Sequence, residues 1–432
     1  MTERWNIIGR AYQTALRFYG MLAVAFSDAY LIYHKTLYEN KNLQNRTEVE
    51  KITMGKIRDM FDTRFRDDRF VRTLSDFVEV YSELAKVTNF GQVYQNISSL
   101  ASIWNNTFVE PLRDTLWRTS SEKIDLENKF SLLHYKQIAN ETCRTPLLII
   151  YALINRHYIL DLLPQISVVR NLLRQGFDIY ATDWGTPSAY DKELTIGHYV
   201  NNYIDNSVDL IRELTQSDKV SLLGYCWGGD LALIYAALHP DKVKNIITLA
   251  TPGDFDLDDG LLNRWVKSLN VDALVDTFGN VPSGLLNSAF VLRSPVDYLH
   301  KYPHFFEKPR DLESIMEFVA TEIWLYDSPP VIGEIFRQFV KDCYQQNLLI
   351  KNQMEVADMR VDLKNIDMPF LNIVASMDDS VAPDSSKALN KTLGSADNSL
   401  IEFPSGHVGA CIGSQAHREL WPKVGGWLKD RS

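Results

Sequence analysis

The sequence predicts an α/β protein with a mostly parallel sheet, helices on both of its faces, an inserted cap and a helical N-terminal extension. Three observations support this fold class. From about residue 121, apolar runs of strand length alternate with helical segments. Between about residues 254 and 365 the alternation stops, and prolines interrupt the helical pieces. The alternation then resumes, so we expect a helical region at 1–120 and an α/β domain at 121–432, with a cap at 254–365.

The N-terminal 120 residues are predicted to be helical. From Phe70 to Leu84, apolar side chains recur at steps of three and four residues, which gives a helix one apolar stripe. Another apolar stretch, from Met21 to Tyr33, contains Asp28 and is too short to span a bilayer. We expect it to pack as a helix on the core or on a partner, and an amphipathic helix on a membrane surface is the alternative.

The elements of the α/β domain follow from the length and period of the apolar runs. Strands are predicted at 130–135, 147–153, 178–181, 220–223, 244–249, 370–375 and 399–403, and helices at 168–175, 198–214, 230–238 and 415–428. The continuous apolar run at 147–153 is typical of a strand buried on both faces. Strands that alternate with helices imply parallel pairing through right-handed crossovers.

Composition limits the classes of function. The chain has 432 residues, 45% of them hydrophobic, which suits one large α/β domain with an added part. Its net charge of −10 argues against a general affinity for nucleic acid or anionic membranes. The four cysteines lie far apart, which argues against a zinc site or another metal site and is typical of reduced thiols in a cytoplasm. The N-terminus lacks the pattern of a signal peptide.

A glycine-rich turn joins the strand at 220–223 to the helix that follows it. The turn reads Gly224-Tyr225-Cys226-Trp227-Gly228-Gly229. A strand, a tight turn and a helix form the setting of a nucleophile elbow, here with Cys in place of Ser. The residues two before and two after the nucleophile must be small, and Gly224 and Gly228 meet this requirement. The helix N-terminus behind the sulfur favours a thiolate, so we predict that Cys226 is a nucleophile.

A thiol nucleophile needs a base, and the base needs a group that orients it. In an α/β-hydrolase arrangement both partners follow the nucleophile in the chain, first the acid and then the His. His407, flanked by glycines after the last predicted strand, is the predicted base. Asp378 and Asp379 follow the strand at 370–375, and either carboxylate is placed to be the acid.

Acyl transfer also requires hydrogen-bond donors for an oxyanion. The backbone N–H of Trp227, directly after the nucleophile, is one predicted donor. The second is expected from the loop after the strand at 147–153, around Ile154 and Asn155. His157 lies in the same loop and is a candidate substrate contact.

Together these residues resemble the polyhydroxyalkanoate synthases, most closely the shorter class III type, over about residues 120–430. The elbow matches the family's Gly-x-Cys-x-Gly-Gly, and the residues around His407 match its Gly-His-Ile/Val-Gly. Further similar segments are 151–156, 159–162, 183–185, 238–243 and 324–329. The family's acid lies in a segment like 379–383 here, where Ser380 replaces a His and Ala382 precedes the Pro. The resemblance therefore selects Asp379 as the acid.

The resemblance implies a polymerisation. His407 takes the proton from Cys226, the thiolate attacks the thioester of a (R)-3-hydroxyacyl-CoA, and CoA leaves. Asp379 then assists the 3-hydroxyl of an acyl unit in its attack on a chain thioester, which extends the growing polyester. The short 3-hydroxybutyryl unit is the expected monomer. CoA is part of the substrate and a product, so no separate cofactor is implied.

The resemblance also implies surroundings and partners. The site must exclude water, and Trp324 and Tyr326 of the predicted cap are expected to contact the substrate there. A homodimer, a helical accessory subunit and a cytoplasmic location at the surface of polymer granules are family expectations. Whether residues 1–120 replace the accessory subunit or bind it stays open.

Two other functions compete with this interpretation. A cysteine hydrolase of the dienelactone hydrolase type resembles the same elbow, but that family is much shorter and has no cap of this size. A non-catalytic granule or scaffold protein does not need the complete order of Cys, Asp and His. If Cys226 is the nucleophile, Cys143, Cys343 and Cys411 are expected to tolerate Ala, and Cys411 follows His407 closely enough to test separately.

Overall fold

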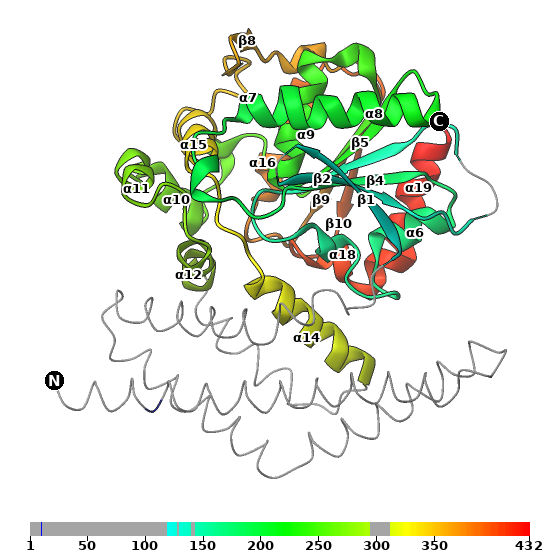
Figure 1. Cartoon of the computed structure of the whole chain (residues 1–432), viewed down its shortest axis with the longest axis horizontal. Coiled ribbons are helices and arrows are strands. Elements are labelled where there is room, and N and C mark those ends of the chain that lie inside the picture. The colour runs from blue at the N-terminus through cyan, green and yellow to red at the C-terminus, as the bar shows by residue number, and fades with distance from the viewer. Residues whose placement is uncertain (1–9, 11–118, 128, 140–142, 294–311) are drawn as a thin grey trace. The chain divides into compact units, whose positions relative to one another are not determined.

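The computed structural model describes residues 10, 119–127, 129–139, 143–293 and 312–432 (Figure 1). Most of the predicted N-terminal helical region, including the stretches at 21–33 and 70–84, lies outside the described residues. The chain divides into two compact units, residues 1–114 with 287–322, and residues 115–286 with 323–432. The second unit contains the sheet and all of the predicted site residues.

An eight-stranded sheet forms the centre of the second unit, in the order β1-β2-β4-β3-β5-β6-β9-β10. Its strands are β1 (Ser121–Glu127), β2 (Phe130–Tyr135), β3 (Leu147–Ile150), β4 (Ile179–Asp183), β5 (Val220–Tyr225), β6 (Val243–Leu249), β9 (Phe370–Ala375) and β10 (Asn398–Phe403). Strand β2 is antiparallel to β1 and β4, and every other neighbouring pair is parallel. A separate ribbon pairs β7 (Glu355–Val356) with β8 (Met359–Arg360). The predicted mostly parallel sheet is confirmed.

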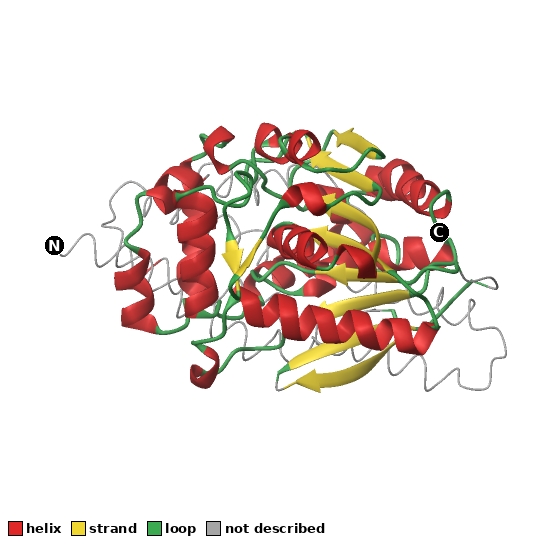
Figure 2. Cartoon of the chain, turned by 90° about the horizontal axis from the view of Figure 1, so that it is seen from above, coloured by secondary structure: helices red, strands yellow, loops and turns green. Residues whose placement is uncertain are grey.

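Helices cover both faces of the sheet, as predicted. The α-helices are α6 (Val168–Arg174), α7 (Ile196–His198), α8 (Asp205–Thr215), α9 (Trp227–Leu238), α10 (Leu261–Lys267), α11 (Val271–Phe278), α12 (Ser283–Arg293), α14 (Leu312–Tyr326), α15 (Gly333–Gln338), α16 (Pro383–Lys387), α17 (Leu389–Thr392), α18 (Gly409–Ile412) and α19 (Trp421–Lys429). Helices α8 and α9 lie on one side of the sheet, and α6 and α19 lie on the other (Figures 1 and 2).

Shorter helical segments connect these elements. Three are π-helical: η4 (Tyr199–Ile204), η7 (Phe339–Gln345) and η9 (Ala416–Leu420). Five are 3₁₀ turns: η2 (His157–Leu160), η3 (Ala189–Asp191), η5 (Pro240–Lys242), η6 (Phe255–Leu257) and η8 (Leu363–Asn365). The π-helix η4 joins α7 to α8, so one continuous helical stretch follows β4.

The core lies between the sheet and these helices. All residues of β3 and β5 are buried, which is why their sequences are continuously apolar or small. Helix α9 packs on β5 and β6, and it is buried from Trp227 to Ala237. A helix that is apolar on all sides belongs in an interior, and this one follows directly from the elbow.

The observed elements differ from the predicted ones most clearly in three places. The strand predicted at 147–153 ends at Ile150, where the chain leaves the sheet. The carbonyl oxygen of the next residue, Tyr151, accepts a hydrogen bond from the Trp184 indole N–H at 3.0 Å. Helix α9 begins at Trp227, ahead of the predicted start at residue 230. Strand β1 was not predicted, because its residues are mostly exposed and polar and lack an apolar period.

Strands β6 and β9 are neighbours in the sheet, yet a long insertion, residues 250–369, separates them in the chain. The insertion contains helices and the ribbon β7–β8, and the cap predicted at 254–365 falls within it. Within the second unit, α11 packs on α15 and α10 packs on η7. These contacts pack the described helices of the insertion on one another.

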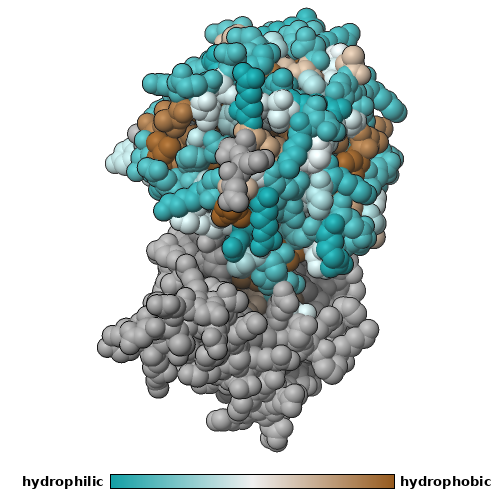
Figure 3. All heavy atoms as spheres, turned by 90° about the vertical axis from the view of Figure 1, so that its right-hand side faces the viewer, coloured by the Kyte–Doolittle hydropathy of each residue, from teal (hydrophilic) through white to brown (hydrophobic). Residues whose placement is uncertain are grey.

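The described surface is mostly hydrophilic on the face shown in Figure 3, and its apolar side chains form separate patches. Large apolar residues with substantial exposure, such as Ile138 and Leu214, occur singly in several elements. Among the described residues, no helix has both the length and the apolar character needed to cross a membrane.

Candidate active site

Cys226 stands at the carboxyl end of β5, where the chain turns sharply into α9. Its backbone has φ 54° and ψ −129°, a conformation that residues with a side chain rarely adopt. Two hydrogen bonds hold this turn: the Cys226 N–H donates to Leu249 O at 2.9 Å, and Gly229 N–H donates to Cys226 O at 2.8 Å. The side chain is partly exposed, so the strained turn presents the sulfur at the sheet edge.

The two elbow glycines are required by close packing. A Cβ atom on Gly228 would lie 2.5 Å from the carbonyl carbon of Tyr151, and one on Gly224 would lie 2.6 Å from Gly228 O. These separations are far below van der Waals contact, so only glycine fits. The turn therefore lies directly against the end of β3, as a nucleophile elbow requires.

His407 and Asp378 meet at the same sheet edge. Asp378 follows β9, and His407 follows the neighbouring strand β10. The His407 Nδ1 atom lies 2.6 Å from Asp378 Oδ2. The other carboxylate oxygen of Asp378 accepts hydrogen bonds from the N–H groups of Ser380 at 2.8 Å and Val381 at 3.0 Å. The carboxylate is thus fixed through one oxygen and orients the imidazole through the other.

The carboxylate that contacts His407 belongs to Asp378, whereas the resemblance selected Asp379. Asp378 is buried with its carboxylate against the imidazole, whereas Asp379 is exposed on the same turn. The tight turn after β9 directs consecutive side chains differently, and the backbone donors at Ser380 and Val381 capture the first carboxylate. Local sequence similarity to a family segment could not show this orientation.

The electrostatic state of His407 follows from these neighbours. Burial alone would lower the pKa of the imidazole. The negative charges of Asp378 and Cys226, together with hydrogen bonds to both, outweigh burial and raise the pKa of His407 to about 10. Cys226 therefore acts on the same imidazole that Asp378 orients. An imidazolium beside the sulfur stabilises a thiolate, so the arrangement can generate a nucleophile.

Two buried residues that the sequence did not single out as catalytic pack around this pair. The Tyr225 ring lies 5.1 Å from the His407 ring, and its hydroxyl donates to the His407 carbonyl oxygen at 3.4 Å. Cys411, in α18, is fully buried. Burial raises the pKa of the Cys411 thiol, against the opposing effect of a hydrogen bond with Tyr225, and nearby Cys226 raises it further. These effects favour the neutral thiol at Cys411, and its tolerance of Ala stays a prediction.

The predicted oxyanion donors lie in the elements that meet at the elbow. Trp227 is the first residue of α9, where a backbone N–H has no intrahelical acceptor. Asn155 lies in the loop after β3 with φ 63°, and its N–H donates to Ser328 Oγ at 3.3 Å. Ile154 is a partly exposed neighbour in the same loop. The donor role of Ile154 and Asn155 stays a prediction.

The three predicted substrate contacts have other partners in the structure. The buried Trp324 donates its indole N–H to Arg156 O at 2.7 Å, which joins the insertion to the loop after β3. The His157 Nδ1 atom lies 3.7 Å from Asp183 Oδ1. Tyr326 is partly exposed at the end of α14.

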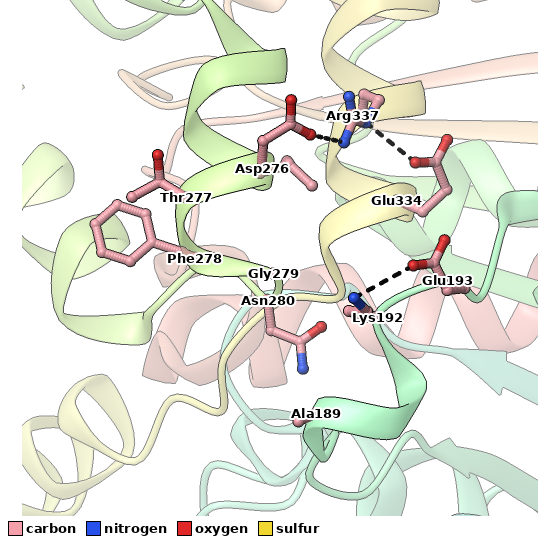
Figure 4. A pocket seen from close by; sticks show the side chains of 11 residues that line it. Ala189, Lys192, Glu193, Asp276, Thr277, Phe278, Gly279, Asn280, Glu334 and Arg337 are labelled. Atoms are coloured by element: carbon pink, nitrogen blue, oxygen red, sulfur yellow. Dashed lines mark hydrogen bonds and ion pairs between the residues drawn. The ribbon is translucent and has the colours of Figure 1, made fainter.

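A pocket of about 580 Å³ lies elsewhere, between α11, α15 and residues 189–193 (Figure 4). It contains none of the predicted site residues. Its two cations are neutralised: Arg337 binds Asp276 at 2.8 Å and Glu334 at 3.1 Å, and Lys192 lies 3.6 Å from Glu193. Such a pocket offers little attraction for the phosphates of CoA.

Comparisons with known proteins agree with the fold. The family described as "alpha/beta hydrolase fold" matches residues 145–410, which is more than half of the chain. The family described as "Poly-beta-hydroxybutyrate polymerase (PhaC) N-terminus" matches residues 116–172. The sheet, the elbow and the first match define the class: this is an α/β-hydrolase-fold protein.

Three relatives share the name "Poly(3-hydroxyalkanoate) polymerase subunit PhaC". The proteins from Thiocystis violacea and Allochromatium vinosum are each 38% identical to this chain; the matches cover 85% and 86% of it, and 98% and 100% of those proteins. The protein from Haloferax mediterranei is 43% identical over 73% of this chain, and the match spans 65% of that longer protein. The chain belongs to the poly(3-hydroxyalkanoate) polymerase family and resembles its class III members, and it is therefore an acyltransferase.

Proposed function

We propose that the chain polymerises (R)-3-hydroxyacyl-CoA, with 3-hydroxybutyryl-CoA as the main substrate, through an acyl thioester on Cys226. The observation that carries this proposal is the hydrogen bond between His407 and Asp378, with Cys226 acting on the same imidazole, in a chain of the polymerase family. The strained turn leaves the Cys226 side chain partly exposed at the end of β5. A thiol, a base and an orienting carboxylate are the groups that acyl transfer needs.

The chemistry of acylation is a balanced exchange of thioesters. The proton of Cys226 moves to His407, and the thiolate adds to the carbonyl carbon of the substrate. The N–H of Trp227 and a second donor near Ile154 or Asn155 stabilise the oxyanion. The bond from carbon to the CoA sulfur then breaks, and CoA leaves with the proton from His407. A thioester on Cys226 remains, and its energy is close to that of the substrate.

Chain extension uses the same groups. His407, oriented by Asp378, removes the proton of a 3-hydroxyl group, and the resulting oxygen attacks the thioester of the growing chain. Each catalytic cycle forms one ester bond and breaks one thioester bond, and the sulfur that leaves takes the proton from His407. Asp378 is proposed as the acid in place of Asp379, because its carboxylate contacts the imidazole. Trp324, Tyr326 and His157 are proposed to line the path of the acyl chain.

The alternative of a dienelactone-type hydrolase loses its basis, because the chain belongs to the polymerase family. The names of the relatives describe each of them as a subunit. We therefore also propose a helical partner subunit, self-association as a homodimer, and work at the surface of polymer granules in the cytoplasm.

The first experiment measures CoA release and product with purified protein and (R)-3-hydroxybutyryl-CoA. Wild type is expected to release CoA and form insoluble polymer. Cys226→Ala is expected to release none, and Cys226→Ser almost none. Cys411→Ala is the matched control, because it removes a buried thiol beside the site and is expected to retain activity. Full activity in Cys226→Ala, or free acid as the only product of wild type, would contradict the proposal.

A further inference from the structure

Between the elbow and the insertion lie polar groups that the proposed triad does not use. Asp230 follows Cys226 by one helical turn, in α9, and is fully buried. Neither oxygen of its carboxyl group has a hydrogen-bond partner among the described residues. An unpaired buried carboxyl group costs free energy, so its presence beside a nucleophile calls for a functional reason.

Tyr344 brings a second group from the insertion. The π-helix η7 packs on the start of α9, where Phe339 stacks on Trp227 with ring centroids 4.3 Å apart. The Trp227 Nε1–H donates to the Tyr344 hydroxyl oxygen at 3.2 Å. Because an indole N–H can only donate, the phenol oxygen is the acceptor and its own proton remains available. The described part of the chain provides no acceptor for that proton.

Both groups lie close to the nucleophile. Burial raises the pKa of the Asp230 carboxyl group well above its usual range, and the charge of Cys226 acts in the same direction. Burial also raises the pKa of Tyr344, against the effect of the hydrogen bond from Trp227, and the charges of Cys226 and Asp230 raise it further. The two groups are therefore a carboxylic acid and a phenol beside the sulfur, each with unused hydrogen-bonding capacity.

We propose that Asp230 and Tyr344 form a subsite that binds the 3-hydroxyl group of the acyl chain, an inference that rests on the proposed function. An acyl thioester of this class has two polar groups near the sulfur. Its carbonyl oxygen only accepts, and backbone N–H groups at the elbow serve it. Its hydroxyl both donates and accepts, so it needs one partner of each kind. The phenol proton of Tyr344 and a carboxyl oxygen of Asp230 supply both.

This assignment gives the subsite a role in specificity. A site that hydrogen-bonds a substrate hydroxyl discriminates against the analogue that lacks it, because its buried polar groups are then left unpaired. Wild-type protein is therefore expected to react faster with (R)-3-hydroxybutyryl-CoA than with butyryl-CoA. Removing the subsite should abolish that preference and leave the reaction of the unsubstituted acyl group intact.

The experiment measures single-turnover CoA release from full-length protein with each of these two substrates. Tyr344→Phe is expected to slow release from the hydroxylated substrate about tenfold, the effect of one neutral hydrogen bond, and to leave butyryl-CoA unchanged. Asp230→Leu should act in the same way. Tyr235→Phe is the matched control. It removes a phenol hydroxyl from α9, the helix of Asp230, where the Tyr235 hydroxyl donates to Asp205 at 2.9 Å, and the rates with both substrates should stay unchanged.

An equal loss with both substrates in Tyr344→Phe would assign this residue to carbonyl binding or to packing of the elbow, and would overturn the subsite. An unchanged preference would overturn it as well. If Asp230→Leu fails to fold, the result with Tyr344→Phe decides whether the subsite exists. Asp230→Asn retains an acceptor oxygen and should keep the preference for the hydroxylated substrate. Absence of CoA release from wild type with either substrate is a different result, and it refutes the proposed function.

Discussion

Asp378 holds the imidazole of His407 through one carboxylate oxygen and is itself held through the other. Because the two oxygens of Asp378 have these different partners, Asp378 and the adjacent Asp379 are not equivalent. Asp378 is buried among fixed donors, whereas Asp379 is exposed on the turn. The charge that orients a catalytic base must be fixed, and only the first of the two carboxylates meets that condition.

The two aspartates provide a matched test. Asp378→Asn is expected to lower the rate of CoA release by about 10²- to 10⁴-fold, because the imidazole loses the charge that orients it. Asp379→Asn makes the same chemical change on the neighbouring residue and should stay within a few-fold of wild type. Steady-state kinetics with (R)-3-hydroxybutyryl-CoA measures both. A larger loss in Asp379→Asn than in Asp378→Asn would reverse the assignment.

The raised pKa of His407 also makes stability depend on pH. Its pKa rises from 6.5 to about 10 on folding, so the folded state binds the proton more tightly than the unfolded chain does. This contribution to the free energy of unfolding is fully present below pH 6.5 and is lost as the pH rises through about 10.

We therefore expect the melting temperature to fall between pH 6.5 and 10, and to fall less in Asp378→Asn, where the main charge that raises the pKa of His407 is absent. Differential scanning calorimetry across this range measures the slope. Asp379→Asn serves as the control and should keep the slope of wild type. Equal slopes in wild type and Asp378→Asn would contradict the electrostatic account.

At the scale of elements, the elbow depends on how closely β3, β5 and α9 approach one another. The first turn of α9 contacts the end of β3 at Gly228, where no Cβ atom fits. This contact places the end of β3 and the start of the loop after it against the elbow. The position of the proposed oxyanion donors in that loop therefore depends on packing between these elements.

Two glycine-to-alanine variants test that packing. Gly228→Ala must push the backbone of Tyr151 away from α9, so we expect strong loss of stability and of CoA release. Gly426→Ala in α19 meets nothing within 4 Å and is expected to stabilise the fold by about 0.5–1 kcal/mol through helix propensity. Urea unfolding and activity measurements on both variants check this. Normal activity in Gly228→Ala would show that the elbow tolerates a wider turn.

At the scale of the whole molecule, the insertion must stay attached to the sheet for Tyr344 to reach the elbow. One attachment is Asp327, a buried carboxylate directly after α14. It accepts a hydrogen bond from the Tyr158 hydroxyl at 2.9 Å, and Arg156 Nε lies 3.5 Å from its other oxygen. Trp324 binds the same loop through Arg156 O.

Removing this carboxylate should loosen the insertion. Asp327→Ala removes the ion-pair partner of a largely buried Arg156, which keeps its hydrogen bonds to Gly185 and Thr186, and we expect a loss of about 3 kcal/mol in the free energy of unfolding. Glu193→Ala removes an exposed carboxylate beside Lys192 and should cost less than about 1 kcal/mol. Chemical denaturation of both variants measures the difference. Similar small losses would show that Asp327 does not secure the insertion.

Local sequence signals specified much of the sheet and two of the three proposed catalytic groups. Apolar runs located β2, β5, β6, β9 and β10 because a buried strand needs a continuous or alternating apolar pattern. The glycines around Cys226 and beside His407 predicted tight turns at which these two side chains project from the end of a strand. Strand β1 escaped prediction because its exposed residues carry no such pattern.

The sequence by itself determined the fold class, the nucleophile candidate and the imidazole candidate, because each is written in a few neighbouring residues. Only the tertiary structure decided between Asp378 and Asp379, since the direction of a side chain on a turn depends on which backbone groups capture it. It alone brought Tyr344 to Trp227, across more than a hundred residues of chain. Such contacts arise from packing between distant segments, and no local pattern encodes them.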